Sequence, residues 1–274
     1  MNKNVFRIAP DVDHFFGLIG DPVAHSFSPL IWNKAFTALS YPAVYHAFKV
    51  TAGNLKNAVS GLIALGFTGI NVTRPHKTAV ASLCNHLHGA AKILQTVNTI
   101  KFVEGQAHGY NTDAIALEKI LRNFSSRQNA LILGNGGAAT AVLYALQRCS
   151  LKKIVQVSRQ PREKPDFAGS QLTARTWNKA NLEQGIEESE IVINTTPLGW
   201  NDEDRLPELE TKLNKQHVFI DVNYNLNSKL LIAARENGST VIDGREPLLI
   251  QALESFRILT GLEPPEKIMR SCIF

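Results

Sequence analysis

A glycine-rich turn between an apolar run and an apolar-faced helix constrains the fold of this chain more than any other feature. Residues 130–146 read ALILGNGGAATAVLYAL, in which GNGGAA (134–139) has the spacing G-x-G-x-x-A. The first glycine permits a tight turn, the second lets the backbone approach a phosphate, and the small last residue allows close packing of helix on strand. Because the start of a helix offers free N–H groups and a positive dipole, the segment predicts a pyrophosphate site for a dinucleotide.

Strands and helices alternate regularly after this turn. Strands are predicted at 129–134, 152–159, 171–177, 190–195, 218–224 and 239–243, and helices at 138–149 and 228–237. Such alternation is typical of a parallel, doubly wound sheet. This half of the chain is therefore expected to form a Rossmann-like dinucleotide-binding domain.

The first half of the chain alternates in the same way. Strands are predicted at 15–20, 44–50, 66–72, 97–103 and 106–110, and helices after Ser28-Pro29, at 55–63 and in the 80s. Ser28 is expected to be the N-cap of the first of these helices, with Pro29 at its first position. With 274 residues the chain is long enough for two domains. A change near residues 111–114 and a returning C-terminal helix predict one domain of 1–111 with 247–274, and a second of 112–246.

Charge and cysteine usage argue against several classes of protein. The net charge of +5 suits an anionic ligand or reflects random variation among surface residues. No run of Lys or Arg exceeds two residues, so nucleic-acid binding is not expected. Cys84, Cys149 and Cys272 lie far apart, which favours a reduced cytoplasmic protein without disulfides or zinc. His86 and His88 have no third ligand nearby and are expected on the surface, so no metal is predicted. The N-terminus is too polar for a signal peptide and no apolar run is long enough to span a membrane, so no membrane association is expected.

The strand after the glycine turn bears on which dinucleotide is bound. It ends in Ser158-Arg159, with Arg162 close behind, and no acid appears before Glu163. An NAD site usually places an acid at the end of this strand, whereas the planar fork of an arginine pairs with a 2′-phosphate. We therefore predict NADP rather than NAD; the alternative is that Arg159 is only a solvated loop cation.

A lysine and a carboxylate, each among short polar residues, suggest a proton-transfer pair. Lys77 ends GINVTRPHK (69–77), and Asp113 ends GYNTD (109–113). In parallel α/β sheets ligands bind at the carboxyl ends of strands, where both HSFSP (25–29) and NVTRPHK are expected. Neutral hydrogen-bonding side chains there suit a polyhydroxylated ligand, so the chain is predicted to interconvert an alcohol and a ketone. Considered alone, Lys77 is more typical of a surface lysine, and Asp113 is equally typical of a helix N-cap.

Ordered segments along nearly the whole chain resemble the shikimate dehydrogenases, including the related quinate/shikimate enzymes. They are GLIGDPVAHSFSP, GFTGINVTRPHK, TVNTI, GYNTD, GNGGAA, VINTTPLG, DVNYN and DGREPLLIQALESFRILTG. The resemblance implies an N-terminal α/β substrate domain, a Rossmann-like doubly wound NADP-binding domain and an active-site cleft between them. It also implies reversible reduction of 3-dehydroshikimate to shikimate with NADPH, on the route to chorismate and the aromatic amino acids.

The same resemblance assigns roles to individual residues. The catalytic positions are those of Lys77 and Asp113. Residues around the substrate are Ser26, Ser28, Thr73, Asn98, Tyr224 and Gln251, and residues around NADP are Gly134, Asn135, Gly136, Gly137, Ala138, Ser158, Arg159, Val222 and Gly244. A carboxylate nearby favours the charged form of a lysine, so we expect an ammonium that stabilises developing oxyanion charge and donates a proton.

A few segments depart from the usual family pattern, and two other functions stay open. SRQ (158–160) replaces an NRT-like triplet, TVNT replaces AVNT, and EPLL replaces a segment that often carries a methionine. One alternative is a quinate/shikimate enzyme that accepts NAD; the other is a non-catalytic NADP-binding sensor, against which the retained Lys77 and Asp113 argue. A folate-linked methylene dehydrogenase shares the two-domain arrangement, but the segments HSFSP and NTD match the shikimate family better. A small-molecule substrate is expected, with a monomer or a homodimer as the assembly.

Overall fold

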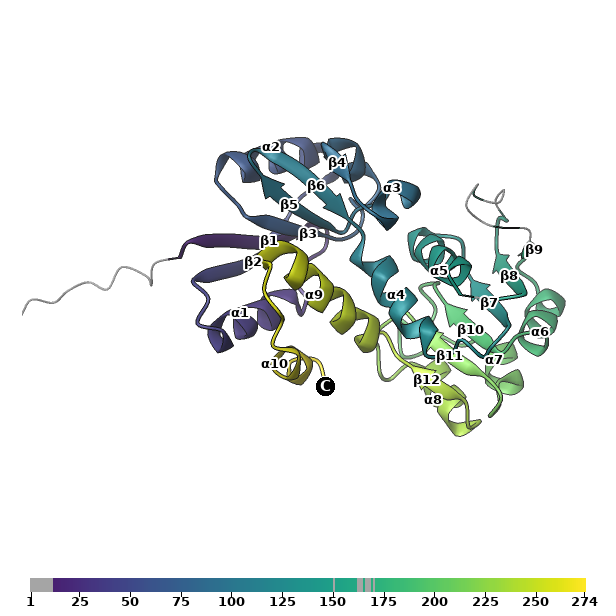
Figure 1. The fold of residues 1–274 in the computed structure, drawn as a ribbon. Helices are drawn as coiled ribbons and strands as arrows, with labels where there is room; N and C mark the ends of the chain where they lie inside the picture. The colour runs from purple at the N-terminus through teal and green to yellow at the C-terminus, as the bar shows by residue number, and fades with distance from the viewer. Residues whose placement is uncertain (1–11, 150, 162–164, 166–168, 170) are drawn as a thin grey trace, which may run out of the picture. The chain divides into compact units, whose positions relative to one another are not determined.

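The structure is a computed structural model, and it describes residues 12–149, 151–161, 165, 169 and 171–274. The described chain divides into two compact units. One runs up to Thr112 and also includes Ala252–Phe274; the other is Asp113–Gln251. Each unit is built on a six-stranded sheet (Figure 1).

The sheet of the first unit mixes parallel and antiparallel strands. Its strands are β1 (His14–Gly20), β2 (Ala43–Lys49), β3 (Gly69–Val72), β4 (His86–Leu87), β5 (Thr99–Val103) and β6 (Gln106–Tyr110). Their order is β2-β1-β3-β5-β6-β4, with β1 parallel to β2 and β3, and β5 antiparallel to β3 and β6. Parallel pairing brings the carboxyl ends of β1 and β3 to one edge, as predicted for the two polar segments that follow them.

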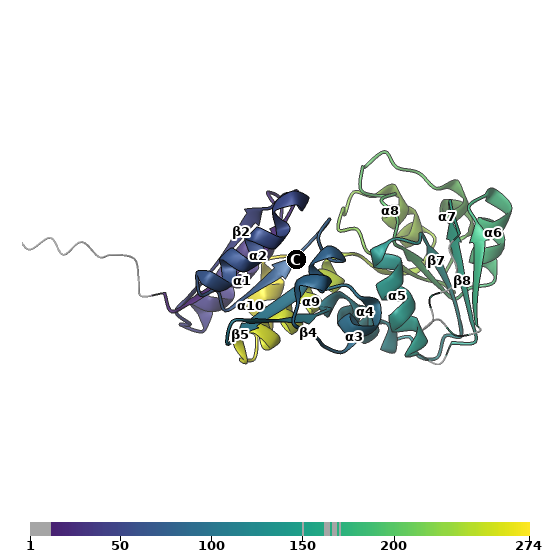
Figure 2. The ribbon, with the colours of Figure 1, turned by 90° about the horizontal axis from the view of Figure 1, so that it is seen from above.

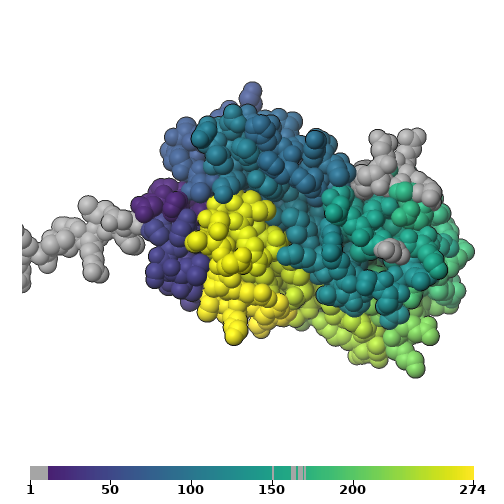
Figure 3. Space-filling model, viewed as in Figure 1, coloured from purple at the N-terminus to yellow at the C-terminus, as the bar shows by residue number. Residues whose placement is uncertain are grey.

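Helices cover both faces of this first sheet. They are α1 (Ser28–Ala38), α2 (Leu55–Ala64), α3 (Ala90–Leu94), the later turns of α9 (Arg245–Thr260), and α10 (Glu266–Ser271). Phe16 of β1 packs against Phe36 of α1, with ring centroids 5.4 Å apart, whereas Ile19 faces the opposite side, where it joins the cluster formed with α2. This alternation is the period of a strand buried on both faces. In the space-filling view the C-terminal residues, in yellow, lie beside the purple N-terminal part of the same unit (Figure 3).

The sheet of the second unit is entirely parallel. Its strands are β7 (Asn129–Leu133), β8 (Lys153–Ser158), β9 (Leu172–Thr176), β10 (Ile191–Asn194), β11 (Val218–Asp221) and β12 (Thr240–Ile242). The order is β12-β11-β10-β7-β8-β9. The strands β7, β8 and β9 are added toward one edge of the sheet, and β10, β11 and β12 are added from β7 toward the other edge. The predicted doubly wound sheet is therefore confirmed.

Both faces of the second sheet are covered as well. The helices are the greater part of α4 (Thr112–Arg122), α5 (Gly137–Gln147), α6 (Lys179–Glu187), α7 (Pro207–Lys212) and α8 (Lys229–Glu236). Leu131 and Val155 on neighbouring strands pack into one cluster with residues of α6, α7 and α8. Helix α5 lies on the opposite face (Figure 2). Near-continuous apolar strands are what burial on both faces demands.

Several predicted elements differ from the structure. The helix expected in the 80s is a short 3₁₀ helix (Ala79–Leu83) followed by β4, because β4 pairs with β6 and this tertiary pairing overrides local propensity. Ser28 was expected to cap α1 but is its first residue, and its backbone N–H donates to the Ser26 hydroxyl at 3.2 Å. Helices α6, α7 and α10 were not predicted. In the described part of the chain, no helix has the length and apolar character needed to cross a membrane.

Phe256 of α9 offers a test of how strongly the C-terminal helix stabilises the first unit. Its side chain is fully buried, and its ring lies 5.1 Å from Trp32 and 5.8 Å from Phe36. We expect Phe256→Ala to lower the free energy of unfolding by about 3–5 kcal/mol, because it deletes a large buried side chain and leaves a cavity. Urea unfolding followed by circular dichroism measures this. The partly exposed Phe15→Ala serves as the control, and an equal effect of both changes would contradict the packing role of Phe256.

Candidate functional site

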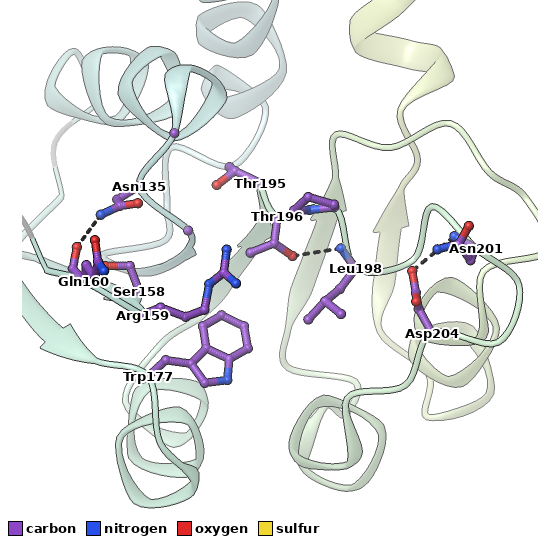
Figure 4. Close-up of a pocket in the computed structure, with 13 residues that line it drawn as sticks. Asn135, Ser158, Arg159, Gln160, Trp177, Thr195, Thr196, Leu198, Asn201 and Asp204 are labelled. Atoms are coloured by element: carbon purple, nitrogen blue, oxygen red, sulfur yellow. Dashed lines mark hydrogen bonds between the residues drawn. The ribbon is translucent and has the colours of Figure 1, made fainter.

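A pocket of about 980 Å³ opens at the carboxyl edge of the second sheet (Figure 4). It lies where β7 and β10 are neighbours, at the point where the strand order reverses. At such a point the connections leave toward opposite faces of the sheet, so a crevice remains between them. The pocket is lined by Gly134, Asn135, Gly136, Ser158, Arg159, Gln160, Trp177, Thr195, Thr196, Pro197, Leu198, Asn201 and Asp204.

The glycine turn forms one end of this pocket. Gly134 has φ of +105°, and a β-carbon there would lie 2.7 Å from the Thr195 hydroxyl, so no other residue fits without strain. A β-carbon on Gly136 or Gly137 would meet nothing within 4 Å, which leaves open space above the backbone. In the part of the chain that the structure describes, no side chain caps the start of α5, so its first N–H groups can bind an anion.

The end of β8 forms the second wall. Ser158 is buried, whereas Arg159 and Gln160 are exposed, and the Asn135 side-chain amide donates to the Gln160 carbonyl at 2.5 Å. Figure 4 shows the Arg159 guanidinium reaching into the pocket between Trp177 and Thr196. Residues 158–161 contain no carboxylate. Arg162 and Glu163, which entered the sequence-based prediction, lie outside the described residues.

The loop after β10 forms the opposite wall. The Asn194 side-chain amide donates to the Leu198 carbonyl at 2.7 Å, and its oxygen accepts from the backbone N–H and hydroxyl of Thr196. The Asp204 carboxylate accepts from the N–H groups of Gly199 and Asn201, so it faces its own loop. Trp177, Leu198, Asn201 and Asp204 were not predicted. Two of them lay in segments that the sequence analysis singled out, because Trp177 ends the predicted strand 171–177 and Leu198 belongs to VINTTPLG.

A buried carboxyl, Asp221, lies beneath this loop at the end of β11. Its side chain is fully buried, and its Oδ1 accepts from the backbone N–H of Asn223 at 2.9 Å and from the Asn194 amide at 3.2 Å. Its Oδ2 has no hydrogen-bond partner among the described residues. Burial raises the pKa of the Asp221 carboxyl to about 7, against the hydrogen bonds from Asn223 and Asn194, and Asp243 adds to the rise. The group therefore holds a proton up to near-neutral pH.

The remaining residues predicted in the second unit lie outside this pocket. Val222 and Gly244 are adjacent, since a β-carbon on Gly244 would lie 2.7 Å from the Val222 carbonyl oxygen. The Tyr224 ring packs edge-on against Trp200 with centroids 5.0 Å apart. Gln251 of α9 donates from its side chain to the Leu248 carbonyl. Gly137 and Ala138 begin α5 and are exposed.

In the first unit, Lys77 lies in a turn between β3 and the 3₁₀ helix, and it is partly exposed. Its carbonyl accepts from the Val97 N–H at 2.8 Å, and the Thr73 N–H donates to the Ile19 carbonyl. The ring of His76, which is buried, donates from Nε2 to the Val50 carbonyl at 2.7 Å. These bonds anchor the turn on both sides. His76 was part of the predicted segment, but its anchoring role was not predicted.

The other candidates of the first unit gather on the same sheet. Ser28 is buried at the start of α1, and Ser26 is half-buried before it. Asn98 is also buried, and its side-chain oxygen accepts from the Thr112 backbone N–H at 2.7 Å. Thr112 begins α4, and Asp113 follows it as a partly exposed residue of the first turn. Among the described residues no group of three His, Cys, Asp or Glu side chains could hold a metal ion.

These features define a two-unit α/β protein of the Rossmann-type dinucleotide-binding class. Residues 18–100 match the family described as the shikimate dehydrogenase substrate binding domain. A shikimate dehydrogenase (NADP(+)) of Methanothermobacter thermautotrophicus is 36% identical over 95% of both chains. The crystal structure of shikimate dehydrogenase from Aquifex aeolicus is 35% identical, with 95% of this chain and 97% of that chain covered and a TM-score of 0.85. Quinate dehydrogenase from Corynebacterium glutamicum, in complex with NAD, is 27% identical, with 94% and 98% covered and a TM-score of 0.86. The chain belongs to the shikimate dehydrogenase family.

Asp221 gives the site a testable pH dependence. The folded protein holds this proton up to about pH 7, whereas the unfolded chain releases it at about pH 4, so the folded state binds more protons between these values. Stability contributed by the group therefore falls as pH rises through this window. We expect the stability of Asp221→Asn relative to the unmodified protein to rise with pH by at most about 1.4 kcal/mol per unit. Urea unfolding at several pH values measures the difference, and a constant difference from pH 4 to pH 8 would refute the raised pKa.

Proposed function

We propose that the protein catalyses the NADPH-dependent, reversible reduction of 3-dehydroshikimate to shikimate, on the route to chorismate and the aromatic amino acids. The observation that carries this proposal is the 36% identity, over 95% of both chains, to a protein named shikimate dehydrogenase (NADP(+)). The second unit, which was predicted as a domain of residues 112–246, would bind NADP. The first unit, 1–111 with 247–274, would bind the substrate. Three free cysteines agree with a reducing compartment, and we propose the cytoplasm.

Two features of the pocket in the second unit support NADP as its ligand. The pyrophosphate is assigned to the turn of Gly134, Asn135, Gly136, Gly137 and Ala138, because open space and uncapped N–H groups lie there. The 2′-phosphate is assigned to Arg159 with Ser158, because residues 158–161 offer a guanidinium and no carboxylate. Val222 and Gly244 are assigned to the nicotinamide end. When bound, NADPH supplies the hydride.

Substrate binding is assigned to polar side chains from several segments of the chain. In this proposal Ser26 and Ser28 hold the carboxylate, and Thr73, Asn98, Tyr224 and Gln251 surround the ring hydroxyls and carboxylate. The hydroxyls and amides match a polyhydroxylated ring because each donates or accepts without carrying charge. Asn98 is held rigidly, as its hydrogen bonds to Thr112 show.

The chemistry assigned to the chain is charge stabilisation and proton transfer. The Lys77 ammonium stabilises the negative charge that develops on the ketone oxygen during reduction, and it donates a proton to that oxygen. Asp113 is assigned the role of orienting the lysine and the hydroxyl. In the oxidation direction the Lys77 amine, in the neutral form that this donation leaves, receives the proton that the hydroxyl releases.

A second candidate function is oxidation of quinate, with NAD as the acceptor. The similarity to a quinate dehydrogenase in complex with NAD favours it, with a TM-score of 0.86. Both candidates are tested by following the absorbance of reduced nicotinamide with shikimate or quinate, each against NADP⁺ or NAD⁺. Turnover of shikimate with NADP⁺ alone supports the first proposal. Comparable turnover of quinate or with NAD⁺ supports the second, and no turnover in any combination favours a non-catalytic NADP-binding sensor.

Arg159 should decide the preference between the two dinucleotides. We expect Arg159→Leu to raise the KM for NADP⁺ about 10- to 100-fold, because a charged hydrogen-bonding partner of the 2′-phosphate is lost. The KM for NAD⁺, which has no such phosphate, should change less than about threefold and serves as the internal control. Steady-state kinetics with both dinucleotides measure the ratio. Equal weakening of both would place Arg159 outside the 2′-phosphate site.

Lys77 should contribute to turnover rather than to substrate affinity. We expect Lys77→Ala to lower kcat about 100- to 1,000-fold with little change in the KM for shikimate, because the lost interaction forms mainly in the transition state. Lys56→Ala, at an exposed position on α2, is the matched control and should keep normal kinetics. A large rise in KM with near-normal kcat would instead make Lys77 a substrate-binding residue.

A further inference from the structure

Inside the first unit, five polar side chains form a buried network that the assigned functions leave unexplained. The five are Asn71 on β3, Asn98 just before β5, Thr99 at the start of β5, Thr112 at the start of α4, and Ser255 on α9. Thr99, Thr112 and Ser255 are 0% exposed, and the two asparagines are nearly so. Groups buried this deeply are costly unless their hydrogen bonds are made. Their bonds can be followed atom by atom.

The bonds of Asn71 set the direction of the network. Its side-chain oxygen accepts from the Tyr45 hydroxyl at 2.9 Å, so its amide nitrogen points the other way. That nitrogen donates to the Ser255 hydroxyl at 2.6 Å and to the Thr99 hydroxyl at 3.0 Å. Because the Ser255 oxygen accepts from Asn71, its own hydrogen can be given to the Thr99 oxygen, 2.6 Å away. The Thr99 hydroxyl then donates to the Asn98 side-chain oxygen at 3.2 Å.

This relay fixes which way the Asn98 amide points. The Asn98 oxygen accepts from the Thr99 hydroxyl and from the Thr112 backbone N–H, and the nitrogen donates to the Thr112 hydroxyl at 2.9 Å. A flipped amide would direct its NH₂ group at the backbone N–H of Thr112, donor against donor. The orientation therefore leaves one N–H of Asn98, and not its carbonyl, to offer to a ligand.

The same bonds hold the start of α4. The Thr112 N–H is at the first position of this helix, where backbone donors have no partner within the helix, and Asn98 supplies the acceptor. Asp113 is the next residue along the backbone. Any movement of the Asn98 amide therefore moves the turn that carries Asp113.

Ser255 has no evident reason to be polar other than this relay. It lies in the interior of α9, where alanine is the better helix former and has no polar group to bury. We infer that Ser255 and Thr99 are positioning residues, which lock Asn98 as a hydrogen-bond donor to the substrate ring and hold the first turn of α4. This inference rests on the proposed function of Asn98 and Asp113.

The relay is tested by removing each hydroxyl and then restoring one. Ser255→Ala and Thr99→Val delete a hydroxyl with little change of shape, whereas Thr99→Ser keeps the hydroxyl and deletes a methyl group. Thr260→Val removes a hydroxyl from the same helix outside the network and is the matched control. Measured for each are kcat and KM for shikimate oxidation, the Kd for NADP⁺, and the thermal midpoint.

We expect Ser255→Ala and Thr99→Val to lower kcat/KM for shikimate at least about tenfold, with kcat and KM both affected, because small misplacements of reacting groups cost rate steeply. The Kd for NADP⁺ should stay within about twofold, and Thr99→Ser and Thr260→Val should keep near-normal kinetics whatever their thermal midpoints. Normal kcat/KM in the two hydroxyl deletions, or an equal loss in Thr99→Ser, overturns the inference. If the unmodified protein itself turns over neither shikimate nor quinate, the proposed function fails instead.

Discussion

The parallel pairing of β7 with β10 is the interaction on which the nucleotide-binding unit depends. The two strands end level, since Asn194 is paired with Leu133, but the chain leaves them toward opposite faces. The turn after β7 enters α5, and the loop after β10 leads to α7, which packs with α6 and α8. The pocket is the space that these diverging connections leave at the sheet edge. Gly134 allows the two to meet closely at its base, where the Thr195 hydroxyl donates to the Leu133 carbonyl at 2.5 Å.

In the first unit, the antiparallel strand β5 brings the polar residues together. The chain enters β5 at the edge where the parallel strands β1 and β3 end, so Asn71 near the end of β3 is paired with Thr99 at the start of β5. Strand β6 returns to that same edge, with Tyr110 opposite Thr99. Segments that precede a strand and segments that follow one therefore meet in one place. This explains how TVNTI, GYNTD and NVTRPHK, which are separated in sequence, come to share hydrogen bonds.

The sequence predicted those features whose cause is local. The glycine spacing before α5 and the alternation of apolar strands with helices depend on neighbours in the chain, and both were confirmed. The strand β4 was predicted as helix because the strand with which it pairs, β6, lies about twenty residues away in sequence. Trp177 and Leu198 enter the pocket through the order of strands in the sheet, which periodicity does not specify. Ser255 was missed for the same reason, since its partner Asn71 is 184 residues distant.

Each unit contains a buried polar cluster, and the two clusters differ in how completely their hydrogen bonds are made. In the first, each buried side-chain nitrogen and oxygen has at least one hydrogen-bond partner among the described residues. Burial raises the pKa of the Tyr45 hydroxyl, although a hydrogen bond with Ser28 acts in the opposite direction, so the network stays neutral. Such a satisfied network fixes orientation. In the second, the Asp221 Oδ2 and the Ser228 hydroxyl have no partner among the described residues. An ionised carboxylate there would be costly, and retention of the proton is the physical response. Asp221 accepts hydrogen bonds from Asn194 and Asn223, and the side chains of both residues donate to the Leu198 carbonyl. The buried carboxyl therefore stabilises the loop that forms this wall of the pocket.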